Sequence, residues 1–421
     1  MIPGFGPKIL ESALEKRPVL LFPLRDPLFP HPPMPNPLLG VFYHWLGGLA
    51  SASFYIFYRG VKKWSWETYW LVGGFFSWII APMLLASLLV PNFWGAIKAA
   101  PPSVVFWAFF FGVLWGFGGL TYGLTMRYLG LALGMAVVLG FCAAFGTLVP
   151  PLVSGQLAVM IMTHPGQVIM LGVATCLAGI GVSGMAGMSK EKELSDEEKT
   201  ATIKEFAYGK GMLVATFSGV MSACFSYGLQ AGKPIRVLAE ASLKANGGSD
   251  LWQNLPVLVV VLWGGFTTNF IWCVILNLRN RSGHEYLNLR PSAVGEVSMA
   301  EGMMPSSAPE ESSLRSTTAV VETPGPAPLF PNYFFSALAG VTWYLQFFFY
   351  SMGQTKMGKY DFSSWTLHMA SIIIFGTLWG IAFHEWRGTS RRTKTLVFIG
   401  LFVLVSSTVI VGYGNYLAAN Y

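Results

Sequence analysis

Apolar residues arrive along this chain in long blocks that short polar segments separate. Each block runs for roughly 20 residues, the length that an α-helix needs to cross about 30 Å of hydrocarbon. The strands of a membrane barrel would instead alternate polar and apolar positions over about ten residues. The pattern predicts ten transmembrane helices, near residues 38–58, 69–90, 103–126, 130–152, 167–188, 211–232, 254–277, 332–353, 363–383 and 395–415.

Three longer segments interrupt the apolar pattern. Residues 1–37 hold ten prolines and only short apolar runs, so they predict an irregular N-terminal arm and not a signal peptide. Residues 189–210 are rich in charged side chains and predict a helical cytoplasmic connector. Residues 280–330 are rich in Ser, Pro, Glu and Gly. We expect them to form a disordered cytoplasmic loop, because such a composition buries too little apolar surface to fold.

The composition agrees with a membrane protein. Of 421 residues, 53% are hydrophobic and 11% are charged, and the mean hydropathy is +0.52, whereas about a quarter of the residues of an ordinary soluble chain are charged. The formal net charge is +7, but Lys and Arg gather at the ends of the apolar blocks and not in one soluble stripe, which argues against a nucleic-acid partner. The partner that the composition requires is a lipid bilayer.

The basic residues also predict an orientation. If residue 1 lies outside the membrane, 17 of the 27 Lys and Arg residues fall in the inner connections. Cytoplasmic loops carry an excess of Lys and Arg in membrane proteins. The distribution therefore favours two termini on the outer side.

The connector at 189–210 divides the predicted helices into five and five, and the two groups share sequence. Residues 112–130 resemble 340–358, residues 48–63 resemble 219–234, and the motif FGTL occurs at 145–148 and at 375–378. These pairs predict two five-helix repeats, residues 38–188 and 211–416. Because five is an odd number, the repeats must cross the membrane in opposite directions, which is an arrangement typical of secondary transporters.

Glycines at a spacing of four are frequent in the third and fourth predicted helices, where Gly119 and Gly123 form one pair and Gly130 and Gly134 another. Small residues let helix backbones approach closely in lipid. We expect these glycines to lie at helix contacts.

Aromatic and polar residues share helix faces at several places within the predicted spans. Flat aromatic rings can cover the C–H groups of a sugar, and amides and hydroxyls can bond its hydroxyl groups. Aromatic belts at the membrane surface and hydrogen bonds between helices are the alternative explanations. The candidate substrate-binding residues are Trp115, Tyr122, Trp343, Gln346, Tyr350, Trp365, Asn269, Ser51 and Ser222.

Titratable side chains are rare within the predicted spans. No Asp or Glu lies deep in any of them, whereas His44 lies in the first and His368 in the ninth. Imidazole titrates near neutrality, so a histidine that faces two compartments in turn can carry a proton. His44 and His368 are therefore candidate proton-coupling residues. A packing role for each histidine, and sodium as the coupling ion, stay open.

The sequence carries no pattern of an enzyme. It has no GxSxG, HExxH, Walker or GxGxxG motif, and neither its six histidines nor its four cysteines have the spacing of metal ligands. We expect no catalytic residue, no metal and no cofactor. Without an ATP-binding domain, transport would draw on an ion gradient.

Several short motifs stand out along residues 40–415. They are YHW at 43–45, KKWSWET at 62–68, PNFW at 91–94, YGLTMRYLG at 122–130, KP at 233, WYLQFFFY at 343–350 and LHM at 367–369. Together these motifs resemble those of the bacterial L-rhamnose-proton symporters of the drug/metabolite transporter superfamily. The resemblance implies ten helices in two inverted halves, a bacterial inner-membrane location, and uptake of L-rhamnose, L-lyxose or a related 6-deoxy sugar with a proton. It also implies a cavity lined by the first, third, fourth, sixth, eighth and ninth helices.

The positions that match the family include His44, Asn269, Lys233, Gln346 and His368. The arm at 1–37 and the loop at 280–330 exceed the family pattern. Two other functions stay open: transport of another sugar or metabolite in either direction on the same fold, and a membrane sugar sensor that does not transport. The sequence leaves the oligomeric state undetermined.

Overall fold

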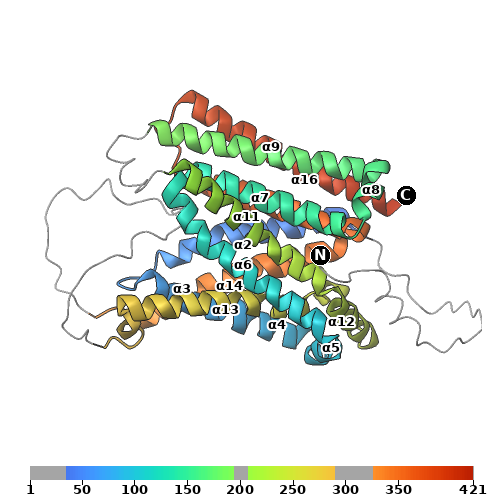
Figure 1. Cartoon of the computed structure of the whole chain (residues 1–421), viewed down its shortest axis with the longest axis horizontal. Coiled ribbons are helices and arrows are strands. Elements are labelled where there is room, and N and C mark those ends of the chain that lie inside the picture. Colours follow the sequence, from blue (N-terminus) through green and yellow to red (C-terminus); the bar gives the residue numbers. More distant parts are fainter. Residues whose placement is uncertain (1–34, 194–206, 290–325, 421) are drawn as a thin grey trace, which may run out of the picture. The chain divides into compact units, whose positions relative to one another are not determined.

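Figure 1 shows a computed structural model of the chain, which describes residues 35–193, 207–289 and 326–420. Every regular element in these ranges is a helix. The arm at 1–34, the middle of the connector and residues 290–325 lie outside the described residues, so the predictions for them remain untested.

Each of the ten predicted blocks coincides with a helix. Eight of these helices are long and apolar enough to cross a membrane, so the protein is an all-helical, multi-pass membrane protein. The helices are α2 (Pro37–Tyr58), α3 (Trp66–Phe75) continued by the π-helix η1 (Phe76–Ile80) and α4 (Ala81–Leu89), α6 (Pro102–Leu129), α7 (Leu131–Val153), α9 (His164–Glu193), α11 (Tyr208–Ala231), α13 (Leu255–Asn280), α14 (Leu329–Lys356), α15 (Ser364–Ala382) and α16 (Arg391–Asn420).

The two helices outside the apolar set are α2 and α14, which have 22 and 28 residues and are therefore long enough. Their lower hydropathy has a structural reason, because they pack against each other and bury polar side chains such as His44, Gln346 and Gln354. A helix that protein surrounds need not be apolar on every face.

Six short helices were not predicted, because each is too short or too polar to form an apolar block. They are α5 (Phe93–Ala99), α8 (Gln156–Met162), α12 (Lys233–Ala245), η2 (Asp250–Trp252), η3 (Ser282–Leu287) and η4 (Gly358–Ser363). Among them α12 is amphipathic, and it packs beside α5 with Ile235, Ala239 and Leu243 buried (Figure 1).

Parts of the predicted loop at 280–330 are ordered, contrary to expectation. Residues 282–287 form η3, and α14 begins at Leu329. The reason is polar bonding to α3, since the Ser282 hydroxyl donates to Glu67 Oε1 at 2.7 Å. The first five residues of the connector, which was predicted to be helical, continue α9 to Glu193.

The long helices pack in a regular set of pairs (Figure 1). α6 packs against α11 and α13, and α14 packs against α2 and α3. α7 packs against α11 and α9, and α15 packs against α2 and α16. The α9–α16 and α7–α15 contacts join these groups.

Glycines set the closest of these contacts. A Cβ at Gly112 of α6 would lie 2.1 Å from the Val261 carbonyl oxygen of α13, and a Cβ at Gly340 of α14 would lie 2.1 Å from the Gly73 carbonyl oxygen of α3. α3 and α13 carry the same motif, GGF, at 73–75 and at 264–266, and the rings of Phe75 and Phe266 lie 5.9 Å apart. Only glycine permits backbones to approach this closely.

The expectation for Gly119 is wrong, because a Cβ there would meet no atom within 4 Å. Gly116 and Gly118 instead face Thr268 and Ser222. Gly130 ends α6 with a φ of 79°, a backbone conformation that side chains disfavour.

We predict that Gly112→Ala lowers the stability of the folded protein by about 1–3 kcal/mol, because the new methyl group overlaps a backbone carbonyl that cannot rotate away. Thermal unfolding of the detergent-solubilised protein measures the loss. Gly119→Ala on the same helix is the matched control and should unfold at or above the wild-type temperature. Equal melting temperatures for the two variants would contradict the contact.

Candidate functional site

Two predicted sugar-binding tryptophans stack at the centre of the bundle. Trp115 of α6 and Trp343 of α14 have ring centroids 5.7 Å apart and an interplanar angle of 25°. Phe347 lies across the edges of both rings, at 5.6 Å from Trp115 and 5.0 Å from Trp343. Helices that lie far apart in the sequence therefore place these rings in one cluster.

The cluster continues to the other predicted aromatic residues through Phe225 of α11. Phe225 stacks on Phe347 at 4.2 Å and on Trp365 of α15 at 5.7 Å. Tyr350 meets Trp365 edge to face at 5.8 Å. The indole N–H of Trp365 donates to the Cys142 carbonyl at 3.0 Å, which fixes this ring against α7.

The two candidate proton-coupling histidines both lie against Tyr350. The ring centroids of His44 and His368 are each 5.2 Å from that of Tyr350. Both histidines are buried, with exposed fractions of 0% and 1%. Neither nitrogen of His44 nor Nδ1 of His368 has a hydrogen-bond partner among the described residues. Buried nitrogens without partners are costly, so their presence at this place favours a functional role.

A glycine makes room for one of these rings. A Cβ at Gly353 would lie 2.8 Å from Nε2 of His44. The small residue on α14 therefore lets the imidazole of α2 lie directly against the backbone of its neighbour.

The remaining predicted residues lie around this cluster and not in it. Tyr122 packs with Leu129, Val138 and Ala215. Asn269 accepts from the Trp70 indole at 3.3 Å and donates to the Gly265 carbonyl at 3.0 Å, so both ends of its amide are bonded within the protein.

Two hydroxyls and an amide complete the predicted set. Ser222 lies against Gly118 of α6, and Ser51 is half-buried on α2. Gln346 is buried, with its backbone carbonyl against Gly47 of α2. Their side chains stay candidates for sugar contacts.

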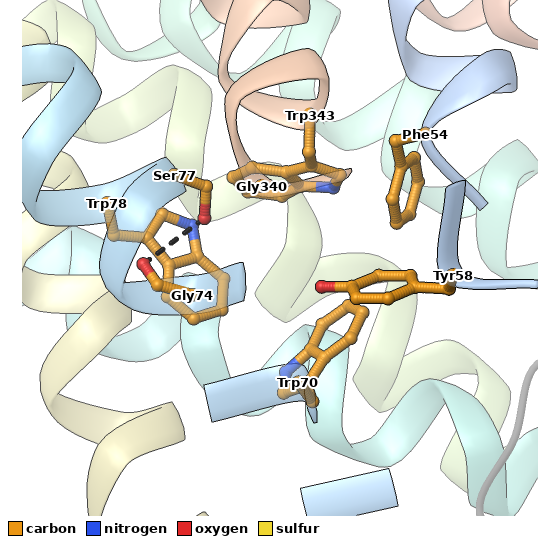
Figure 2. A pocket seen from close by; sticks show the side chains of 8 residues that line it. All are labelled: Phe54, Tyr58, Trp70, Gly74, Ser77, Trp78, Gly340 and Trp343. Atoms are coloured by element: carbon orange, nitrogen blue, oxygen red, sulfur yellow. Dashed lines mark hydrogen bonds between the residues drawn. The ribbon is translucent and has the colours of Figure 1, made fainter. Parts of the chain in front are cut away.

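The second span contributes to the site, although neither its sequence nor the resemblance singled it out. Figure 2 shows a small cavity between α2, α3, η1 and α14, with the rings of Trp70, Trp78, Trp343 and Tyr58 around it. Trp78 is 3% exposed. Its ring centroid lies 6.5 Å from that of Trp115 and 5.3 Å from that of Trp343. The signal that could have marked this span is the GGF motif that it shares with α13.

The cavity is much smaller than a sugar. Its volume is about 10 Å³, enough for about one water molecule. Pockets that bind small molecules have volumes of about 300 Å³ or more. The aromatic rings themselves fill the centre of the bundle in this conformation.

Polar contacts join the helices at one end of the bundle, near the start of α12. Arg236 Nη1 donates to Asp361 Oδ2 at 3.1 Å, and Lys233 Nζ lies 3.8 Å from Oδ1 of the same carboxylate. Lys356 forms a second ion pair with Asp250 at 2.9 Å. Asp361 lies in η4, which leads directly into α15, and the residue that leaves the helical conformation is Tyr360 before it.

Contacts at the opposite end join α3 to η3. Glu67, which is 1% exposed, accepts from Ser282 and from Asn280 at 3.0 Å. Ser65 donates to Glu285 through its backbone N–H at 2.8 Å and its hydroxyl at 2.9 Å. Polar side chains therefore join helices at both ends of the bundle.

The described residues offer no site for a metal. No group of three or more His, Cys, Asp or Glu side chains in these ranges could hold an ion, and the four cysteines are buried thiols. The chemistry that this arrangement can perform is the binding of a small neutral ligand and of protons.

We predict that Asp361 and Arg236 are energetically coupled, because the ion pair is mostly shielded from water. Asp361→Asn and Arg236→Gln should each lower the unfolding temperature in detergent, and the double variant should lose less than the sum, with a coupling of about 1–3 kcal/mol. The pair Lys244 and Glu240 on the exposed face of α12 is the control. It should show a coupling below about 0.5 kcal/mol. Equal coupling energies for the two pairs would contradict a larger contribution of the Asp361–Arg236 ion pair to stability.

The model of one protein family, "L-rhamnose-proton symport protein (RhaT)", matches residues 34–294 and 318–418 of the chain. Of the stretches that it leaves unmatched, 1–33 and 295–317 fall within the arm and the loop that exceed the family pattern. The chain is 35% identical over 377 residues to the L-rhamnose-proton symporter of Escherichia coli O17:K52:H18 (strain UMN026 / ExPEC), and the match covers 89% of this chain and 97% of that protein.

The L-rhamnose-proton symporter of Shigella sonnei (strain Ss046) is 34% identical over the same length, with the same coverage. The matched regions contain the aromatic cluster, both buried histidines and the polar contacts at the two ends of the bundle. The chain belongs to the L-rhamnose-proton symport protein (RhaT) family.

Proposed function

We propose that this protein imports L-rhamnose, or else L-lyxose or a related 6-deoxy sugar, by symport with a proton. The observation that carries this proposal is the match to L-rhamnose-proton symporters over nearly their whole length. The buried aromatic cluster with two unpartnered histidines supplies the kinds of side chain that a sugar and a proton require.

We further propose that ten helices cross the membrane as two inverted repeats, with α2 and α14 among them. Corresponding contacts support this. Gly48 of α2 packs on Ser371 of α15, and its counterpart Gly219 of α11 packs on Phe141 of α7. Gly172 of α9 packs on Val411 of α16, and Gly400 of α16 packs on Ser183 of α9. Each of these two helices thus contributes a glycine to the same interface.

The directions of the third and eighth helices support the inversion. α6 begins beside α12, and α14 ends beside η2, which itself contacts α12. α6 and α14 therefore run in opposite directions, as copies separated by five spans must.

The sugar contacts that we propose are the aromatic residues of the cluster together with the polar side chains around it. The rings would cover the apolar faces and the methyl group of the sugar, and the amides and hydroxyls would bond its hydroxyl groups. The set is Trp115, Tyr122, Trp343, Gln346, Tyr350, Trp365, Asn269, Ser51 and Ser222.

A bacterial inner-membrane location with both termini outside accords with the basic residues. The helix ends that lead into basic connections gather at one end of the bundle, where Lys62 bonds Asn332 and the Ala207 N–H donates to the Tyr128 carbonyl. We assign this end to the cytoplasm, because cytoplasmic ends carry the positive charge.

Uptake into reconstituted vesicles tests the function. With an inside-alkaline pH gradient we expect labelled L-rhamnose to accumulate above its external concentration, and with a sodium gradient of equal size we expect equilibration only. A protonophore should abolish the accumulation. Binding of L-rhamnose without movement across the sealed bilayer would instead identify a sensor, and accumulation driven by sodium would contradict proton coupling.

His44→Gln and His368→Gln test the proton site that we propose. Glutamine keeps the polarity but does not titrate, so each variant should lose accumulation driven by the pH gradient and keep exchange of labelled for unlabelled sugar. His164→Gln, at an exposed position at the start of α9, is the control and should accumulate sugar as the wild type does. Wild-type accumulation by His368→Gln would remove this residue from the mechanism.

A further inference from the structure

The second span contains an irregular turn beside the central cavity. Residues 76–80 form a π-helix within the span Trp66–Leu89. The segment after the matching GGF motif runs as a regular α-helix in α13. The fold therefore does not require a π-turn at this place. Single π-turns within α-helices occur frequently at functional sites.

The π-turn carries Trp78 into the middle of the aromatic cluster. The ring of Trp78 lies against Trp70, Trp115, Trp343 and Phe266, with centroid distances of 5.3 to 6.5 Å. At the matching position of α13, four residues after the second glycine of GGF, the side chain is that of Asn269. The second half of the chain thus places no bulky ring at the equivalent point.

The polar side chains of the π-turn make no hydrogen bond to another described helix in this conformation. The indole N–H of Trp78 is buried and has no acceptor among the described residues. The hydroxyl of Ser77 bonds back to the Gly74 carbonyl of its own helix at 3.3 Å, as Figure 2 shows. A buried donor without an acceptor next to a cavity is what a ligand hydroxyl would satisfy.

We propose that the cavity beside Trp78 and Trp343 widens into the chamber that holds the sugar, and that Trp78 is its movable wall. The π-turn holds the indole in the space that the sugar occupies, and relaxation of this turn to α-helix moves the indole aside. This rests on the proposed function. An i→i+5 turn holds one residue more than an α-turn, so its relaxation rotates Trp78 by about 100° around the helix axis. The indole N–H then bonds a sugar hydroxyl at the edge of the opened chamber.

A cysteine at position 77 tests the motion. Ser77 is 3% exposed in the closed chamber, so Ser77→Cys should react slowly with a small, water-soluble maleimide and about tenfold faster when L-rhamnose is present. Ser218→Cys, in the tight α6–α11 contact, is the control and should stay unreactive with or without sugar. Labelling reports binding and not turnover, so it can be read even if the substitution slows transport.

Trp78→Phe tests the contact to the sugar. It keeps a ring but removes the N–H donor, and we expect the KM for L-rhamnose to rise about tenfold while the ratio of accumulated to external sugar at saturation stays unchanged. Trp263→Phe is the matched control, because the Trp263 indole also lacks an acceptor but lies in an apolar groove away from the chamber. Its KM should equal that of the wild type.

The outcomes separate the two proposals. If the wild type accumulates L-rhamnose but the labelling of Ser77→Cys is the same with and without sugar, the movable wall is overturned and the transport function stands. An unchanged KM in Trp78→Phe overturns the contact to the sugar. If the wild type accumulates no L-rhamnose, the proposed function is wrong and the wall proposal falls with it.

Discussion

Direct contact between helix backbones at glycine determines the centre of this protein. In lipid, helices gain little from hiding apolar surface, so close packing must hold them together. Gly112 and Gly340 bring α6 and α14 against the backbones of α13 and α3. Trp115 and Trp343 follow these glycines by one helical turn, so the same contacts that fix the helices bring the two indoles to within stacking distance. The candidate sugar site is a consequence of the glycine contacts.

The contacts also explain why α2 and α14 can carry polar residues. Neighbouring helices cover much of their surface, so His44, Gln346 and Gln354 face protein and not lipid. The hydropathy of these two helices falls for this reason, although their length is sufficient for a span. The length of the apolar blocks predicted all ten long helices. A strict threshold of mean hydropathy would have left out α2, which carries His44, and α14, which carries Gln346 and Gln354.

What the sequence could not predict depends on contacts between distant segments. The presence of η3 depends on hydrogen bonds to another element, such as that of Ser282 to Glu67. The amphipathic α12 has no apolar block, and the π-turn at 76–80 has no sequence signature of its own. For the candidate site, helical spacing and residue type indicated Trp115, Trp343, Tyr350 and Trp365, which the structure places in one cluster. The sequence pattern does not distinguish Trp78, because a tryptophan in an apolar block is equally consistent with a position facing lipid and one facing a cavity.

The two proposed halves differ at one place that matters for coupling. Around Tyr350 lie His44 and His368, whereas around Tyr122, the matching residue of the first half, lie Ala215 and Val138. If the halves are related as proposed, these alanine and valine side chains occupy the positions that correspond to the two histidines. The two histidines that we propose as proton sites therefore have no titratable counterpart at the matching positions of the first half. If they bind a proton as proposed, the binding acts at one end of the scaffold only, so it can favour one of the outward and inward states over the other.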